Sequence, residues 1–279
     1  MDAFPRDFFA SGHHGRSATR VGAVVPAPDW RYNRSSIFGG SMEFSVMTYN
    51  IHLGLDSDLE TLAGIIGEAD VVALQEVGND WFEGAEGHQA QQLAKLSGLN
   101  HYRFAAARTV VPGSDPPEAR SAPTAEDRPG WGVALLSRFP LGPWTRHRLP
   151  KRQDLQRCIL SGTVVTPSGP VTVMVTHLSP CDADRMAQGG AVVRHAQTQA
   201  SPLMVLGDLN AEREDPALEG LERFLVNASQ DPMPSYPSAA PERAVDHIYV
   251  SSEMTVVGEA MPVPIMGSDH LPVMARLSL

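Results

Sequence analysis

The chain has 279 residues, of which 42% are hydrophobic and 19% are charged. These fractions are ordinary for a globular protein and allow either one large domain or two small ones. The net charge of −10 excludes a broad basic surface for nucleic acid, although a local basic channel stays open because 20 of the basic residues are arginine. The 24 Gly and 23 Pro favour strands joined by turns over a helix bundle.

Cysteines and apolar runs bear on the compartment. Cys158 and Cys181 are too few for a disulfide framework, which suits a reducing environment. No stretch approaches the roughly 18 apolar residues that a membrane span needs, and the first forty residues show no apolar signal-peptide core. We therefore expect a cytoplasmic protein without a membrane span, and we expect it to be a monomer.

Residues 1–41 differ in composition from the rest of the chain. They include turn residues such as those at 39–41 and have no sustained periodicity, which predicts a poorly ordered N-terminal extension. The alternative is that the phenylalanines and Trp30 of this segment pack on the domain. We expect one domain over 42–279, with Met42 as an alternative start of translation.

The remaining segments alternate between strands and helices. The strands that we expect cover residues 44–50, 71–74, 102–106, 133–136, 159–165, 171–176, 203–206, 245–250, 254–258 and 273–277. The predicted helices cover residues 59–66, 89–99, 184–199 and 216–224. Residues 108–129, rich in Pro, Ser, Ala and charge, predict a long irregular loop. The fold class that fits is α/β, a four-layer sandwich of two facing mixed sheets flanked by helices.

Short apolar strands in this chain repeatedly end in polar residues that can bind a metal or a proton. These polar ends are Asn50, Gln75-Glu76, His177, Asp208 with Asn210, and Asp246-His247, and a sixth cluster, Ser268-Asp269-His270, precedes the last strand. Ligand sites in α/β proteins form where strand ends meet. Buried polar groups are costly without partners, so the six clusters would best satisfy one another, or a metal, at one place.

Each cluster also has an ordinary structural interpretation. Asn50, Asp208 and Asn210 are common turn residues. A buried His177 is more often a histidine with satisfied hydrogen bonds than a catalytic group. The joint occurrence of all six clusters is what argues for a site.

Seven segments together resemble the endonuclease/exonuclease/phosphatase superfamily, whose fold is similar to that of pancreatic deoxyribonuclease. They are Thr48-Tyr-Asn-Ile-His52, Leu74-Gln-Glu-Val77, Gly132-Val-Ala-Leu-Leu-Ser-Arg138, Thr176-His-Leu178, Gly207-Asp-Leu-Asn210, Val245-Asp-His-Ile248 and Gly267-Ser-Asp-His-Leu-Pro272. The short motifs most resemble those of the small bacterial branch of the superfamily. Members of the superfamily cleave DNA, RNA tails, sphingolipids or inositol phosphates, so the resemblance leaves the substrate open.

The resemblance implies a metal region and a water-activating group. Glu76 would be the main ligand of Mg²⁺, a hard cation that prefers carboxylate oxygen, and Mn²⁺ would be a substitute. Asn50 and Asp269 would complete the metal region, and the number of metal ions stays open. Asp208 would orient or deprotonate the attacking water, with Asn210 as a positioning group.

The histidines have implied roles at the phosphate. His177 and His270 would bond phosphate oxygens and stabilise the charge that grows at phosphorus. Asp246 would accept a hydrogen bond from His270 and fix its tautomer. Whether His270 or Asp208 is the base stays open.

Four more residues enter through the family pattern. His247 stands where many relatives have an aromatic residue, and we interpret it as structural rather than catalytic. Arg157 matches a position where relatives often have arginine, and it either meets phosphate or is a solvated strand residue. Arg185 and Gln188 would anchor a helix to the sheet.

These observations predict Mg²⁺-dependent hydrolysis of a phosphodiester by attack of water on phosphorus. The substrate partner would be a phosphate ester: a nucleic acid, a phospholipid or an inositol phosphate. The alternatives are a phosphomonoesterase of the inositol-phosphate type and an inactive binding scaffold of the same fold.

Overall fold

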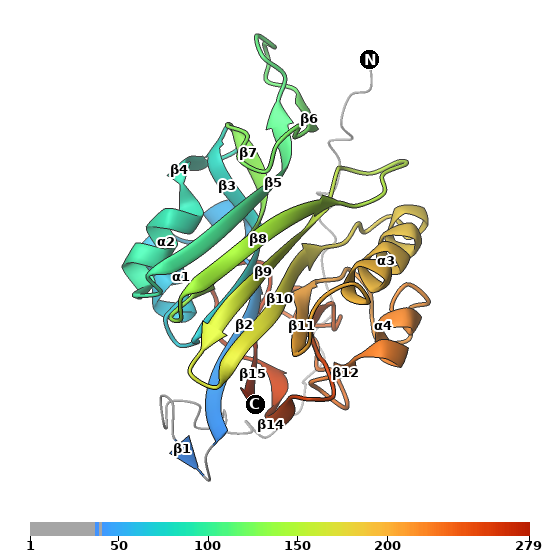
Figure 1. Cartoon of the computed structure of the whole chain (residues 1–279). Coiled ribbons are helices and arrows are strands. Elements are labelled where there is room, and N and C mark those ends of the chain that lie inside the picture. The colour runs from blue at the N-terminus through green and yellow to red at the C-terminus, as the bar shows by residue number, and fades with distance from the viewer. Residues whose placement is uncertain (1–36, 39–40) are drawn as a thin grey trace, which may run out of the picture.

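The structure, a computed structural model, describes residues 37–38 and 41–279 (Figure 1). Ile37–Phe38 (β1) pairs with Ser41 and Met42, so the first long strand begins one residue before the predicted domain start. The rest of the segment predicted to be a poorly ordered extension lies outside the described residues.

The larger sheet of the described chain has nine strands. Its main order is β14 (Thr255–Pro262), β15 (Val273–Ser278), β2 (Ser41–Asn50), β3 (Val71–Trp81), β7 (Gly130–Ser137), β5 (His101–Val110) and β6 (Ala119–Ser121). Strand β1 lies beside β2, and β4 (Ala85–His88) lies beside β3. The sheet is mixed because β2 and β3 are parallel while β3 and β7 are antiparallel.

The smaller sheet has six strands within the described range. Their order is β12 (Val226–Asn227), β13 (Asp246–Val250), β11 (Leu203–Asp208), β10 (Gly169–His177), β9 (Cys158–Thr166) and β8 (Leu141–Arg148). Strands β10 and β11 are parallel, whereas β11 and β13 are antiparallel. This sheet is therefore also mixed.

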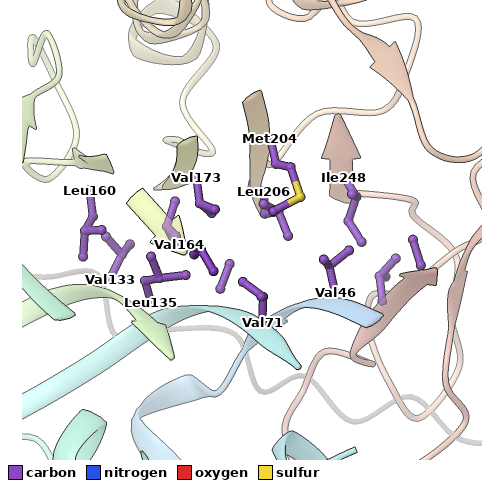
Figure 2. Close-up of a cluster of buried hydrophobic side chains, with 14 of the residues drawn as sticks. Val46, Val71, Val133, Leu135, Leu160, Val164, Val173, Met204, Leu206 and Ile248 are labelled. Carbon is purple, nitrogen blue, oxygen red and sulfur yellow. The ribbon is translucent and has the colours of Figure 1, made fainter. Parts of the chain in front are cut away.

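Three buried apolar layers hold the molecule together. The central layer lies between the sheets, where side chains of both interdigitate (Figure 2). The second joins the outer face of the larger sheet to α1 (Leu59–Ile66) and α2 (Gln89–Ser97), and the third joins the smaller sheet to α3 (Asp182–Ala196) and α4 (Glu219–Phe224). Leu53 of η1 (His52–Gly54) belongs to the central layer. The predicted four-layer α/β sandwich is confirmed.

Local chemistry explains the helix ends and the apolar strands. Asp58 accepts a hydrogen bond from the N–H of Thr61 and so caps α1. Gly98 ends α2 in the left-handed conformation, with φ of 74°. Strand β7 is buried along its whole length because layers cover both of its faces. No helix in the described part of the chain is long and apolar enough to cross a membrane.

The short strands β1, β4 and β12 were not predicted, and three longer segments also differ from the sequence predictions. Strand β3 continues through Glu76 to Trp81 instead of ending at Glu76, because a bulge there interrupts only one step of the pairing. The predicted irregular loop over 108–129 contains β6, which pairs with the end of β5 and forms an arm beyond the sandwich (Figure 1). Strand β8 was not predicted, since an edge strand with mostly half-buried and exposed positions lacks a long apolar run.

Candidate active site

Strand register brings three of the predicted site residues together on the smaller sheet. His177 ends β10 and lies opposite Asp208 of the parallel strand β11. Asp208 lies opposite Asp246 of the antiparallel strand β13. Gly207 permits this close approach, because a Cβ there would lie 2.1 Å from the carbonyl oxygen of Thr176. The polar strand ends recognised in the sequence therefore meet at one edge.

Asn50 connects this edge to the larger sheet. Its Nδ2 donates to Oε1 of Glu76 and to Oδ2 of Asp208, at 3.1 Å in both cases. Its Oδ1 accepts from the N–H of His52 at 3.0 Å. The Asn50 side chain is buried, so one amide holds two carboxylates that come from different sheets.

Glu76 is aimed by the backbone. It has φ of 53°, in the left-handed region, and it is the residue skipped in the pairing between β3 and β7. A non-glycine residue there costs about 1–3 kcal/mol, which the surrounding sheet must offset. Bulges re-aim side chains, and this one turns the carboxylate toward Asn50 and partly toward solvent.

His177 is fixed as a neutral ring. Arg157 donates from Nη1 to Nδ1 of His177 at 2.9 Å, so the ring proton belongs on Nε2, which lies 3.3 Å from Oδ2 of Asp208. Burial, with the positive charge of Arg157 and His270, holds the pKa of His177 well below its usual range. Nδ2 of Asn210 lies 3.2 Å from the same Nε2 and donates to the carbonyl oxygen of Leu178. His177 is therefore an N–H donor at neutral pH.

His270 is held in the opposite charge state. Its Nδ1 lies 2.8 Å from Oδ2 of Asp246, and its Nε2 lies 3.6 Å from Oδ2 of Asp208. Burial lowers the pKa of His270, but the charge of Asp246, their hydrogen bond, and the charges of Asp208 and Asp269 outweigh it and raise the pKa to about 10. Both ring nitrogens thus face carboxylates, which favours the imidazolium.

Asp208 lies at the centre of these contacts. Its Oδ1 accepts from the N–H of Asn210 at 2.9 Å, while its Oδ2 meets Asn50 and both histidines. Burial, and then the charge of Asp246, raise the pKa of Asp208 to about 7 against the opposing effects of His270, Asn210 and Asn50. This carboxylate is less acidic than an exposed one.

The last cluster borders the site on its open side. The hydroxyl of Ser268 donates to the carbonyl oxygen of Asn50 at 2.7 Å and fixes this segment to the end of β2. The neighbouring Asp269 is half-buried, and its Oδ1 lies 3.8 Å from Nδ1 of His52. His52 also bonds Asp56 at 2.8 Å. His52 and Asp56 were not among the predicted site residues, although His52 belongs to the first recognised segment.

The endonuclease/exonuclease/phosphatase family model matches residues 47–270, which include every predicted site residue. The chain belongs to this family. No curated protein matched. Among solved structures, an endonuclease/exonuclease/phosphatase from Beutenbergia cavernae is 27% identical, with a TM-score of 0.68 over 85% of this chain and 72% of that one.

Two further solved structures share the fold at lower sequence identity. The human nocturnin catalytic domain with a bound sulfate anion is 24% identical, with a TM-score of 0.57 over 84% of this chain and 94% of that one. A mannosyl-6-phosphatase from Bacteroides thetaiotaomicron is 15% identical, with a TM-score of 0.62 over 84% of this chain and 99% of that one. The shared fold therefore does not select a substrate.

The donor set suits the divalent cation that the family implies. The carboxylate of Glu76 has one hydrogen-bond partner, Asn50, among the described residues, so further oxygen lone pairs stay free. The carboxylate of Asp208 shares the Asn50 amide with Glu76, and the charges of Glu76 and Asp269 both act on His52. Oxygen is the donor that Mg²⁺ prefers. Asn50 turns its amide N–H groups toward the carboxylates, so in this arrangement it positions Glu76 instead of offering its own oxygen.

Other predicted residues lie around the site. The Nε2 of His247 bonds the carbonyl oxygen of Ala211 at 2.8 Å, and its ring stacks on Tyr249. Gln188 joins α3 to the N–H of Ser179 and to the carbonyl oxygen of Pro150. The contacts of His247 are structural in kind, and those of Gln188 join α3 to two loops.

The two predicted arginines have different surroundings. Arg185 of α3 pairs with Asp182 and Asp215, so it joins the helix to the segment after β11. Arg157 is not a solvated strand residue, since its side chain is 7% exposed and bonds His177.

Sequence reasoning missed the group that holds Arg157. The buried carboxylate of Asp184 accepts from the backbone N–H groups of Arg152, Gln153 and Asp154, at 2.6, 2.9 and 2.6 Å. Asp154 then accepts from the hydroxyl of Ser179 at 2.6 Å and from Arg157 at 3.5 Å. An acidic residue in the first turn of a helix was the sole signal in the sequence, and capping explains it equally well.

Proposed function

We propose that this chain is a divalent-metal-dependent phosphodiesterase that uses water to attack phosphorus. The observation that carries the proposal is the Asn50 amide, which joins Glu76 of one sheet to Asp208 of the other beside two histidines in different charge states. This arrangement offers oxygen ligands for a cation, donors for phosphate oxygens and an acceptor for a proton within one cluster.

Glu76 would hold the cation, with Asp269 at the border of the same space and Asn50 keeping the Glu76 carboxylate in place. When bound, Mg²⁺ would polarise the phosphate and offset its negative charge. The donor set applies equally to Mn²⁺, which we expect to substitute.

The chain's own groups would supply the remaining steps. His177 would donate from Nε2–H and His270 from its imidazolium to non-bridging oxygens, which stabilises the charge that develops at phosphorus. Because carboxylates face both nitrogens of His270, that ring is a donor, and Asp208 is the group left to accept the proton of the attacking water. Asn210 would orient the water beside Asp208.

Hydrolysis of bis(p-nitrophenyl) phosphate tests the reaction class. We expect turnover with Mg²⁺ or Mn²⁺ that EDTA abolishes, and faster turnover of this diester than of p-nitrophenyl phosphate. Turnover of the monoester alone would replace the proposal with a phosphomonoesterase. Turnover of neither ester with either metal would favour the inactive scaffold.

The variant Glu76→Gln tests the metal assignment. Loss of the charged ligand should raise the Mg²⁺ concentration needed for half-maximal activity by at least about tenfold. Glu68→Gln is the matched control, because Glu68 is an exposed glutamate after α1. Wild-type metal dependence in Glu76→Gln would show that the assignment is wrong. The monomeric state and cytoplasmic location stay predictions.

A further inference from the structure

Beside the site, two arginines and two tryptophans form a continuous row on the same edge of the sandwich. The guanidinium of Arg157, bonded to His177, lies 5.1 Å from the ring centroid of Trp131. The guanidinium of Arg108, at the end of β5, lies 5.5 Å from the same centroid and 5.3 Å from that of Trp81. Strands β3, β5 and β7 supply Trp81, Arg108 and Trp131, and Arg157 directly precedes β9. The row begins beside His177 and leads away from it.

The two arginines of the row differ in what they bond. Arg157 bonds His177 and Asp154. Within the described residues, the guanidinium of Arg108 has neither a hydrogen bond nor an ion pair, although the residue is only 8% exposed. Its nitrogens are nevertheless not sealed from solvent, since none is among the fully buried polar atoms that lack partners.

Nearby acidic groups do not satisfy Arg108. Glu83 is exposed and accepts from Nε1 of Trp81 at 2.9 Å. Asp154 is engaged by Ser179 and Arg157. Burial, with the charge of Arg157, lowers the pKa of Arg108 despite the opposing charge of Glu83. A mostly buried guanidinium without a partner is costly, so its retention beside the site points to an anionic ligand.

The shape of the contact narrows the kind of ligand. Cation–π attraction to indole rings holds a guanidinium without using its N–H groups as hydrogen-bond donors. These N–H groups form a planar fork whose parallel donors match two oxygens of one tetrahedral phosphate. Arg108 is therefore set up for an oxyanion.

We propose that Arg108, held by Trp81 and Trp131, binds a second phosphate of the substrate, adjacent to the phosphate that is attacked. This inference rests on the proposed function, and it narrows the substrate class to phosphate esters that carry a second phosphate. Trp131 contacts both arginines, so one indole separates the subsite from the arginine that supports His177. A nucleotide chain and an inositol polyphosphate both provide such a pair of phosphates.

Calorimetric titration in the presence of Mg²⁺ tests the subsite without turnover of a diester. The ligands are thymidine 3′,5′-bisphosphate, inositol 1,4-bisphosphate and thymidine 5′-monophosphate, each checked by chromatography to be intact afterwards. We expect wild type to bind one bisphosphate roughly 10- to 100-fold more tightly than the monophosphate, which is the range of a charge-assisted hydrogen-bonded pair. The bisphosphate that binds more tightly identifies the source of the second phosphate.

Three variants assign that preference to Arg108. Arg108→Gln should lose it, and Arg108→Lys should keep only part of it, because lysine keeps the charge without the planar fork. Arg120→Gln should behave as wild type, because Arg120 is exposed on β6 opposite Thr109. This substitution removes one positive charge, as Arg108→Gln does. If Arg108→Gln does not fold, Arg108→Lys alone carries the test.

The outcomes separate this inference from the reaction class. Equal binding of bisphosphates and monophosphate by wild type, or an unchanged preference in the Arg108 variants, would overturn the subsite. An Arg108-dependent preference in a protein that hydrolyses no diester would instead overturn the phosphodiesterase and leave the subsite standing. Loss of the preference in Arg108→Gln, together with turnover of bis(p-nitrophenyl) phosphate by wild type, is the result that supports both.

Discussion

The pairing of His270 with Asp246 makes a sharp quantitative prediction. Oδ2 of Asp246 accepts from Nδ1 of His270 at 2.8 Å and from the hydroxyl of Ser235 at 2.6 Å, and the carboxylate side chain has no exposed surface. Asp246→Asn keeps the size and one oxygen but removes the charge that stabilises the imidazolium. A hydrogen bond to a charged group is worth roughly 1.5–3 kcal/mol.

If that stabilisation is realised in the transition state, Asp246→Asn should lower kcat by roughly 10- to 150-fold. His270→Ala should lower it by roughly 10²–10⁴-fold. The double variant should resemble His270→Ala alone, because the two residues act as one unit. The assay is turnover of bis(p-nitrophenyl) phosphate at saturating Mg²⁺, with Tm and Mg²⁺ affinity measured on each variant.

Ser235→Ala is the matched control. It removes a neutral donor from the same oxygen, worth roughly 0.5–1.5 kcal/mol, and should therefore reduce kcat less than Asp246→Asn does. The reasoning would be refuted by an Asp246→Asn variant within about twofold of wild type, or by equal effects of the Asp246 and Ser235 changes. It would fail too if unfolding, reported by Tm, accounted for the whole loss.

Two further predictions concern stability. Asp184→Asn weakens three bonds to the N–H groups of residues 152–154 and should lower the free energy of unfolding by roughly 1.5–3 kcal/mol in urea titrations. Burial raises the pKa of Asp184, but those bonds and the charge of Arg152 outweigh it and bring the pKa below the ordinary 3.8, so this stabilisation exists above pH 3.8. The difference in the free energy of unfolding between wild type and variant should shrink as the pH falls below 3.8. A difference that stays constant would contradict the assignment. Gly207→Ala should lower both Tm and kcat because its Cβ would overlap Thr176, whereas Gly64→Ala, with open space in α1, should raise the stability by roughly 0.5–1 kcal/mol.

The layers and the meeting point of the motifs were accessible from the sequence. Apolar runs such as Val71–Leu74 predict buried strands, and a polar residue directly after each run, such as His177 or Asp208, predicts an edge where side chains meet. Helical spacing placed α1 and α2 correctly, and Gly98 marked the end of α2. These features are local, so one segment of chain is enough to read them.

Features that depend on distant residues were not accessible. The left-handed Glu76 lies within a strand, and its bulge arises from pairing with β7. The tautomer of His177 follows from Arg157, whose position depends on the bonds that Asp184 makes to another loop. The lack of a partner for Arg108 is likewise visible only after the chain has folded.

The two hydrogen bonds that Asn50 donates to Glu76 and Asp208 have a consequence for folding as well as for chemistry. Each sheet contributes only part of the site, and the parts come into register only when the central apolar layer has closed. A chain that has formed one sheet alone therefore holds an incomplete set of groups, and partially folded forms should have no phosphoesterase activity. The rate at which activity returns during refolding would then report the rate at which the two sheets dock. Signals from secondary structure do not resolve that step.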